Sequence, residues 1–263
     1  MRRLVAACVI GMAMLSRCVG AQEPQRDEHI RDMERQLAAA MRLLSDWGGL
    51  NHYGSEDTEV PPPALDENRV VFLGDDITEQ WAADGGSFFP DKHYLNRGVA
   101  RQTTGQMLVR FQQDVVDLKP KVVVISGGSN DLAGFSGPAT ETTIGWNLKS
   151  MTEVAKANGI RVVLASVTPV CNCYSDQTSK RPQGKIIGLN ASIKRYAASS
   201  GSVYLNYYSA LADGRNLKKE LTSDGLHLNQ AGYAIMTPLA EAAIEQALTQ
   251  NLVRPLAGRE LSR

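Results

Sequence analysis

Two short segments of the sequence carry residue types suited to acyl-transfer chemistry. In "SDGLHLNQAGY", Asp224 precedes His227 by three residues, and a carboxylate that orients an imidazole makes that imidazole a competent general base. In "SGGSNDLAG", the Asn130 amide follows an apolar run and could donate a hydrogen bond to a developing oxyanion. Each segment alone also has a structural interpretation, in which Asp224 caps a helix and Asn130 with Asp131 shapes a turn.

A third segment, "VVFLGDDITEQW", places a carboxylate where a strand gives way to a helix. The apolar run ends at Gly74 and Asp75, and Asp76 follows at the turn. A side chain at such a turn stands at the end of a strand, which is the usual position for a nucleophile or a ligand-binding group.

The elements that must position these residues alternate between apolar runs and amphipathic stretches. Continuous apolar strands separated by helices predict a parallel sheet covered on both faces, an α/β fold with three α/β/α layers. Ligands bind beyond the carboxyl ends of such strands, so we expect Asp76, Arg101, Asn130 and the loop at Cys171 to converge. The expected strands are Val70–Leu73, Tyr94–Leu95, Val122–Ile125, Arg161–Ser166 and Val203–Leu205, and the expected helices are Thr104–Leu118, Glu141–Asn158, Lys185–Ser199 and Gln230–Thr249.

The N-terminus predicts export. Two arginines precede a short apolar stretch, and the small residues Val19-Gly20-Ala21 suit a signal-peptidase site, so residues 1–21 are expected to be a signal peptide and the protein secreted or periplasmic. A lipoprotein signal at Cys18 is the alternative, although Arg17 stands where that signal needs a small residue. We expect residues 22–68 to form an amphipathic helix (Glu28–Trp47) and a Pro-rich linker, residues 69–250 the main domain, and residues 251–263 a tail.

Composition argues against nucleic acid as a partner, because 28 basic residues balance 28 acidic ones in the 263-residue chain. The mature chain would retain two cysteines, Cys171 and Cys173. We expect two free or weakly oxidised loop thiols, because a Cys-x-Cys ring is small and two thiols alone make half a zinc site. The remaining histidines of the mature chain, His29, His52 and His93, have no metal-ligand spacing.

Together and in this order, the segments resemble the SGNH, or GDSL-type, family of esterases and acylhydrolases. Gly74–Ile77 matches the family's Gly-Asp-Ser block except at Asp76, and Gly128–Asp131 matches Gly-x-Asn-Asp. Asp224 and His227 match Asp-x-x-His, and "NRGVARQTTGQMLVRF" is similar to the second block, with Arg101 at the position of its glycine. The resemblance covers about residues 69–248 and implies a flavodoxin-like sheet of five parallel strands and no cofactor or metal.

The resemblance also implies roles for individual residues. In the family a serine attacks the ester carbonyl, and a histidine oriented by an aspartate takes its proton. The oxyanion is held by the nucleophile's backbone N–H, the block-two glycine N–H and the block-three asparagine. Here these positions are Asp76, Arg101 and Asn130, with Asp224 and His227 as the acid–base pair. The flanking Gly74, Asp75, Gly128 and Asp131 are expected to support the site.

Asp76 makes the ordinary serine mechanism unavailable. Two unit charges about 4 Å apart repel by roughly 4 kcal/mol at an effective dielectric near 20, so a carboxylate opposes an adjacent oxyanion. We hypothesise that Asp76 pairs with the Arg101 side chain and with His227, which would lower the pKa of the carboxylate and raise that of the imidazole. The alternative is that Arg101 points to solvent and the two substitutions are unrelated.

Several functions stay open at this point. The sequence favours a secreted SGNH-type ester hydrolase that is impaired or inactive as a serine esterase. An altered hydrolase could instead use Asp76 as a carboxylate nucleophile at an sp³ carbon, with Arg101 holding an anionic substrate, or use water activated by His227. A non-catalytic domain could bind an acylated glycan or another small ester, and a structural domain would have an inaccessible pocket. The loop Asn172–Pro182 is expected to face the substrate.

Overall fold

The structure is a computed structural model that describes residues 27–38, 41, 44–81 and 88–250. The chain divides into two compact units, residues 1–47 and 48–263. In the first unit residues 27–38 are helical, and the apolar side chains Ile30, Met33 and Leu37 of this helix are exposed. The predicted signal peptide and C-terminal tail lie outside the described residues. No helix in the described part of the chain is long and apolar enough to span a membrane.

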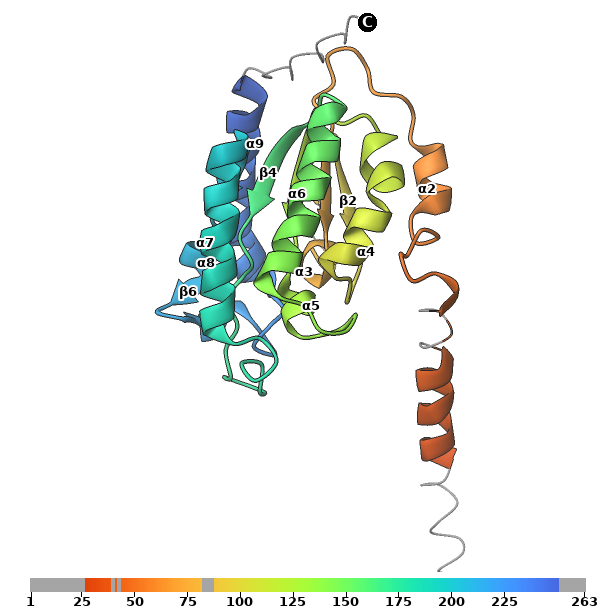
Figure 1. The fold of residues 1–263 in the computed structure, drawn as a ribbon, viewed down its shortest axis with the longest axis vertical. Helices are drawn as coiled ribbons and strands as arrows, with labels where there is room; N and C mark the ends of the chain where they lie inside the picture. Colours follow the sequence, from red (N-terminus) through yellow and green to blue (C-terminus); the bar gives the residue numbers. More distant parts are fainter. Residues whose placement is uncertain (1–26, 39–40, 42–43, 82–87, 251–263) are drawn as a thin grey trace, which may run out of the picture. The chain divides into compact units, whose positions relative to one another are not determined.

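The second unit is built on a sheet of five parallel strands (Figure 1), which confirms the predicted fold class. The strand order is β2-β1-β3-β4-β5, so the chain changes direction across the sheet between β1 and β3. That reversal creates a crevice at the carboxyl ends of the two strands, where ligands bind in such folds. The strands are β1 (Val70–Gly74), β2 (Tyr94–Gly98), β3 (Val122–Ser126), β4 (Arg161–Ala165) and β5 (Val203–Leu205).

Alternate side chains of each strand enter two separate apolar cores, one on each face of the sheet. In β1, Val70 and Phe72 pack into the core beneath α9 (Gln230–Thr249), whereas Val71 and Leu73 pack into the core beneath three other helices. Those helices are α4 (Thr104–Val109), α6 (Glu141–Ala157) and α7 (Gln183–Ser200). The result is the expected three-layer sandwich, visible in Figure 1.

The predicted helix Thr104–Leu118 is correct only in its first half. Helix α4 ends at Val109, and a π-helical turn η1 (Gln112–Val116) follows. The fully buried Arg110 lies between them and bonds inward to Asp114 and to the Gly74 carbonyl, so a polar side chain occupies a core position of the turn. A π-helical turn is wider than an α-helical one, and such turns occur where a side chain disturbs the regular hydrogen bonds of a helix.

Short elements complete the second unit. The Pro-rich segment expected to be a loop contains the helix α2 (Gly54–Glu59), which is tied to edge strand β2 by ion pairs from Arg97 to Glu56 and Asp57. The others are α3 (Asp76–Glu79), α5 (Ser129–Leu132), α8 (Tyr207–Leu211), the hairpin β6 (Ala212–Asp213) and β7 (Asn216–Leu217), and η2 (Lys219–Leu221).

Candidate active site

Strand β1 ends in a sharp turn that presents Asp76. Asp75 caps helix α3, because its Oδ1 accepts a hydrogen bond from the backbone N–H of Ile77 at 3.2 Å. A β-carbon at Gly74 would collide with the Thr78 side chain and lie 2.9 Å from the Ser126 carbonyl oxygen, so the turn needs glycine. Burial, together with the adjacent Asp76 charge, raises the pKa of Asp75 to about 7.

The Asp76 carboxylate accepts hydrogen bonds from two of the three donors that the family uses for an oxyanion. Its Oδ2 lies 2.8 Å from the backbone nitrogen of Arg101 and 2.7 Å from Nδ2 of Asn130. Its Oδ1 lies 3.7 Å from Nε2 of His227, the distance of an ion pair rather than of a hydrogen bond. The sequence-predicted residues therefore meet at one point, and the carboxylate stands where a substrate oxygen would be expected.

These contacts keep Asp76 ionised. Burial alone raises the pKa of a carboxyl group, but here it is outweighed by His227, by Asn130, and by the backbone N–H groups of Arg101 and of Asp76 itself. Together they lower the pKa of Asp76 to about 2. All three expected oxyanion donors thus act on the protein's own carboxylate.

His227 lies between two carboxylates. Its Nδ1 is 2.6 Å from Oδ2 of Asp224, and its Nε2 faces Asp76. The contact with Asp76 is the largest cause that raises the pKa of His227; burial opposes it, Asp224 adds to it, and the pKa reaches about 9. The imidazole is therefore doubly protonated at neutral pH and cannot accept a proton from a nucleophile or from water.

The backbone around Asp224 fixes the position of this carboxylate. Asp224 Oδ1 accepts hydrogen bonds from the backbone N–H groups of Leu226 at 2.9 Å and His227 at 2.8 Å. Thr222 Oγ1 donates to the His227 carbonyl at 2.6 Å. Gly225 between them has a left-handed backbone (φ +91°), which suits glycine. The Asp224–His227 pair is thus held by main-chain bonds before any ligand binds.

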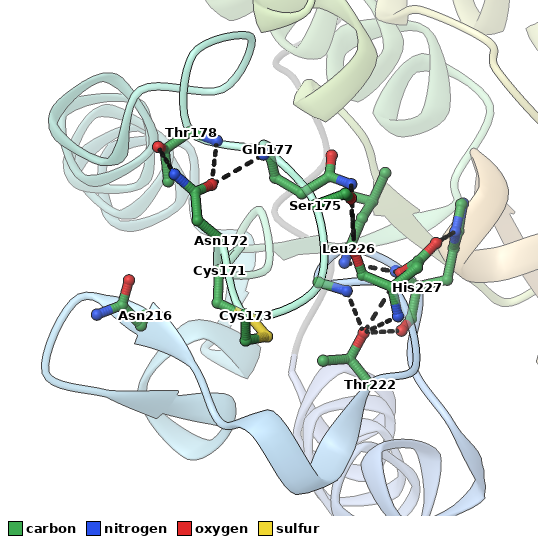
Figure 2. Close-up of a disulfide and its surroundings, with 12 residues drawn as sticks. Cys171, Asn172, Cys173, Ser175, Gln177, Thr178, Asn216, Thr222, Leu226 and His227 are labelled. Atoms are coloured by element: carbon green, nitrogen blue, oxygen red, sulfur yellow. Dashed lines mark hydrogen bonds and ion pairs between the residues drawn. A yellow bond between two sulfur atoms is a disulfide. The ribbon is translucent and has the colours of Figure 1, made fainter.

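The loop expected to face the substrate also braces the Asp224 segment (Figure 2). Ser175 Oγ and Gln177 Nε2 both donate to the Asp224 carbonyl, at 3.1 and 3.3 Å. The Cys171 backbone N–H donates to the Gly225 carbonyl at 2.9 Å. The expectation of two free or weakly oxidised thiols is replaced by a bond between them, since Cys171 and Cys173 form a disulfide. This bond closes the base of the loop beside the segment that carries His227.

The hypothesis that the Arg101 side chain pairs with Asp76 was wrong. Only the Arg101 backbone N–H reaches Asp76, and the ion pairs of the described residues include none to the Arg101 guanidinium. The guanidinium instead lies over the Phe135 ring, with its central carbon 4.6 Å from the ring centre. Arg101 has a left-handed backbone (φ +66°), which aims its N–H at the carboxylate and turns its side chain to the exposed rim.

Arg181 is a site residue that sequence reasoning missed. Its Nη2 donates to Asn130 Oδ1 at 3.0 Å and its Nε donates to Ser129 Oγ at 2.9 Å, in a side chain that is almost wholly buried. Because Asn130 Oδ1 accepts from Arg181, its Nδ2 must point toward Asp76. Arg181 falls in the loop Asn172–Pro182, but nothing in its polar stretch "TSKRP" distinguishes it from an exposed residue.

The predicted supporting residues lie beneath the site. Gly128 has a left-handed backbone (φ +119°) just before α5. Asp131 accepts hydrogen bonds from the Thr104 backbone N–H at 2.9 Å and from Thr104 Oγ1 at 2.6 Å. This pair joins the start of α4 to the short helix α5, and so helps to fix Arg101 and Asn130 relative to one another.

A family comparison agrees with this arrangement. The sequence profile of the GDSL-like Lipase/Acylhydrolase family matches residues 72–235, which contain the β1 turn, Asn130 and the Asp224–His227 pair. The chain belongs to this family. Among the described residues of this GDSL-type protein, no group of three or more His, Cys, Asp or Glu side chains is arranged to hold a metal ion.

Solved structures resemble the GDSL-type domain over most of its length. A candidate acylhydrolase from Bacteroides fragilis is 38% identical, with a TM-score of 0.73, and the match covers 77% of this chain and 99% of that one. A GDSL-like lipase from Bacteroides thetaiotaomicron is also 38% identical, with a TM-score of 0.72, over 77% and 100% of the two chains.

A curated relative matches over a shorter length. The uncharacterized lipoprotein YqeF of Bacillus subtilis is 34% identical over 79 residues, 29% of this chain. The match spans only 32% of that relative, so the likeness covers about a third of its length.

Proposed function

We propose that this protein is a GDSL-type carboxylic ester hydrolase domain in which Asp76 blocks serine-esterase chemistry by filling the oxyanion hole. One observation carries the proposal: Asp76 Oδ2 accepts hydrogen bonds from both the Arg101 backbone N–H and the Asn130 amide. A substrate carbonyl needs those same donors in the transition state. One such donor contributes about 2.7–4 kcal/mol to acyl transfer, so losing both to a fixed carboxylate removes most of this stabilisation.

The protonation of His227 supports the same conclusion. A general base must be unprotonated at the working pH, and the pKa of His227 is raised to about 9. Water activation by His227 is therefore disfavoured at neutral pH even if a substrate could enter. Asp76 therefore prevents ester hydrolysis in two ways: it occupies the oxyanion donors, and it keeps the general base His227 protonated.

Replacing Asp76 with serine tests the proposal. In Asp76→Ser the hydroxyl supplies a nucleophile, the oxyanion donors become free, and the pKa of His227 falls toward the ordinary range near 6.5. We expect the wild type to be silent on short-chain 4-nitrophenyl esters and Asp76→Ser to gain at least about 10³-fold in kcat/KM.

Two controls separate the restored triad from other effects. Asp76→Asn removes the charge without adding a nucleophile and is expected to stay silent, and Asp76→Ser with His227→Ala is expected to lose the gained turnover. Wild-type ester hydrolysis that His227→Ala abolishes would overturn the proposal and favour water activation by His227. Silence of every variant would favour a ligand-binding domain.

A second candidate function uses Asp76 as the nucleophile. It is favoured by the ionised state of Asp76 and by the looser, 3.7 Å contact of its Oδ1. Oδ1 would displace a halide ion from an sp³ carbon and form an ester. That ester would carry no charge at Asp76, so His227 could then release a proton and activate water for its hydrolysis. Halide release from a haloalkanoate by the wild type, lost in Asp76→Asn, would identify this activity.

We also propose that the chain is exported after cleavage near Ala21. The proposal rests on the charged and apolar N-terminal sequence and on the lipoprotein relative. N-terminal sequencing of protein recovered from the periplasm or medium is expected to begin at Gln22. A lipid-modified N-terminus at Cys18 would contradict cleavage near Ala21 and show instead that the protein is anchored to a membrane.

A further inference from the structure

The rim of the site carries an exposed guanidinium on an aromatic ring. The central carbon of Arg101 lies 4.6 Å from the centre of the Phe135 ring, and the side chain is exposed. The Arg101 backbone is fixed by the hydrogen bond from its N–H to Asp76, and its φ is +66°. A left-handed backbone at a residue with a β-carbon costs about 1 kcal/mol or more, so the fold holds Arg101 in a conformation that favours glycine.

A second guanidinium on the same ring provides a contrast. Arg181 lies 5.4 Å from the Phe135 ring centre, but it is buried and donates to Ser129 and Asn130. For the Arg101 guanidinium the structure gives the ring contact alone: the ion pairs and side-chain hydrogen bonds of the described residues include none that it makes. Arg181 therefore has a structural role, whereas the donors of Arg101 remain available to a ligand.

The backbone that carries the Phe135 ring is held in place. The Phe135 backbone N–H donates to the Asn130 carbonyl at 3.1 Å. Next to it, Ser136 Oγ lies 2.8 Å from Thr103 Oγ1 and donates to Gln106 Oε1 at 3.0 Å. The segment Phe135–Ser136 is thus tied both to the residue that faces Asp76 and to the start of α4. A binding segment with a fixed backbone loses less entropy when a ligand binds.

The outer guanidinium, Arg101, is the charge at the rim that favours an anion. Asp76 and Asp224 both face the protonated His227, and Arg181 interacts with the carboxylates of Asp75, Asp76 and Asp224, so these inner charges offset one another. Arg101 adds a further positive charge near Arg181. Two guanidinium groups that share one ring repel each other, and an oxyanion placed at the outer one relieves that repulsion.

We propose that Arg101, seated on Phe135, forms a subsite for an oxyanion group, a carboxylate or a phosphate, of the ligand. The planar fork of a guanidinium matches either group through two parallel hydrogen bonds. The Arg101 backbone N–H belongs to the oxyanion hole and its guanidinium to the subsite. The anionic group of a ligand is therefore separated from the acyl carbon by about the length of the arginine side chain. Where the oxyanion hole is free, as in Asp76→Ser, the preferred substrate is therefore an ester whose acyl part carries a second, anionic group. This choice of ligand rests on the proposed function, whereas anion binding at Arg101 does not.

Titration of the full-length wild-type protein tests the subsite directly. Succinate, inorganic phosphate and the uncharged succinamide are titrated separately and binding is followed by NMR or calorimetry. We expect one or both anions to bind at millimolar concentration, Arg101→Gln to weaken that binding at least about tenfold, and Arg101→Lys to restore part of it. Which anion binds more tightly distinguishes a carboxylate from a phosphate.

A matched control uses another exposed arginine. Arg195 lies on the exposed side of α7, and Arg195→Gln is expected to leave anion binding unchanged. Equal binding by wild type and Arg101→Gln, equal loss in Arg195→Gln, or absence of anion binding by the wild type would each overturn the subsite.

A kinetic experiment tests the link to acyl chemistry. In the Asp76→Ser background, the ratio of kcat/KM for 4-nitrophenyl hemisuccinate over 4-nitrophenyl acetate is expected to fall about tenfold when Arg101 becomes glutamine. An unchanged ratio would show that Arg101 does not select the acyl group. If Asp76→Ser has no esterase activity, the proposed function fails, and the anion titration still decides whether Arg101 forms the subsite.

Discussion

The Asp76 carboxylate lies 2.7 Å from the Asn130 amide nitrogen, so a side chain of the protein occupies the position of a reaction intermediate's oxygen. The Arg101 backbone N–H completes the arrangement at 2.8 Å. Arg181 fixes the orientation of the Asn130 amide, because it donates to Asn130 Oδ1 and so leaves Nδ2 to face Asp76. The same donors that would stabilise an oxyanion therefore stabilise the resting carboxylate.

The ionisation of His227 should depend on Asp76. An NMR titration of the imidazole signals is expected to give a pKa of about 9 in the wild type and a value displaced toward 6.5 in Asp76→Asn. The fall occurs because Asp76 is the largest cause of the raised pKa, while Asp224 remains in place. A His227 pKa that is the same in both proteins would show that Asp76 does not control it.

Folding stability should decline on the alkaline side. The pKa of His227 is raised in the folded state, so its contribution is fully present below pH 6.5 and is lost between pH 6.5 and about 9. Allowing for partial solvent exposure, the loss should be on the order of 1–2 kcal/mol. Urea unfolding of wild type and His227→Gln across this range measures it as a difference. Parallel stability curves for the two proteins would contradict the prediction.

Below neutral pH, folding stability should decline as the pH falls, because of Asp76. The pKa of Asp76 is lowered to about 2, so its contribution is present above the unfolded value of 3.8 and is lost as the pH falls toward 2. The stability difference between wild type and Asp76→Asn should therefore shrink between pH 4 and pH 2.

Helix α3 should depend on the absence of a β-carbon at Gly98. A β-carbon there would collide with the backbone of Thr78 and Glu79, directly after the Asp76 turn. Gly98→Ala is expected to lower the free energy of unfolding by about 2–4 kcal/mol, because backbone cannot move aside as a flexible side chain can. Gly145→Ala is the control, since nothing lies within 4 Å of its β-carbon position in α6. That change should stabilise by about 0.5–1 kcal/mol, and equal effects at both sites would refute the packing argument.

The sequence carried enough information for the sheet, because continuous apolar runs such as Val122–Ile125 are found only where both faces of a strand are covered. The structure also brings together the five residues predicted for the site, Asp76, Arg101, Asn130, Asp224 and His227. The buried arginines could not be predicted. Arg181 bonds to Asn130, which is 51 residues away, and Arg110 bonds to the Gly74 carbonyl, which is 36 residues away, as well as to the nearby Asp114 and Gln102. An arginine is buried only where such partners satisfy its donors, and the distant ones cannot be inferred from local sequence. The direction of the Arg101 side chain depends on a backbone angle that no spacing reveals.

Arg110 illustrates the cost of such a group. Its fully buried side chain donates to Asp114 Oδ2 at 2.6 Å, to Gln102 Oε1 at 2.5 Å and to the Gly74 carbonyl at 3.0 Å. Arg110→Ala would leave the Asp114 charge buried and unpaired, and is expected to lower the free energy of unfolding by about 3–5 kcal/mol.

Removing both charges separates pairing from packing at this position. Arg110→Met combined with Asp114→Leu should recover much of the stability lost in Arg110→Ala, because no unpaired charge remains. Chemical denaturation of the three proteins measures the comparison. A double variant as unstable as Arg110→Ala would show that the lost bonds to Gln102 and Gly74, rather than the unpaired charge, carry the effect.

The central claim is that Asp76 alone keeps an otherwise complete acyl-transfer site silent, and covalent labelling with a fluorophosphonate tests it most directly. A serine at position 76 would attack phosphorus with His227 as base, fluoride would leave, and the phosphonyl oxygen would enter the donors of Arg101 and Asn130. Intact-mass and peptide analysis is expected to show no label on the wild type and one label per chain on Asp76→Ser, at residue 76, dependent on His227. Labelling of the wild type, or no labelling of a folded Asp76→Ser protein, would contradict the account.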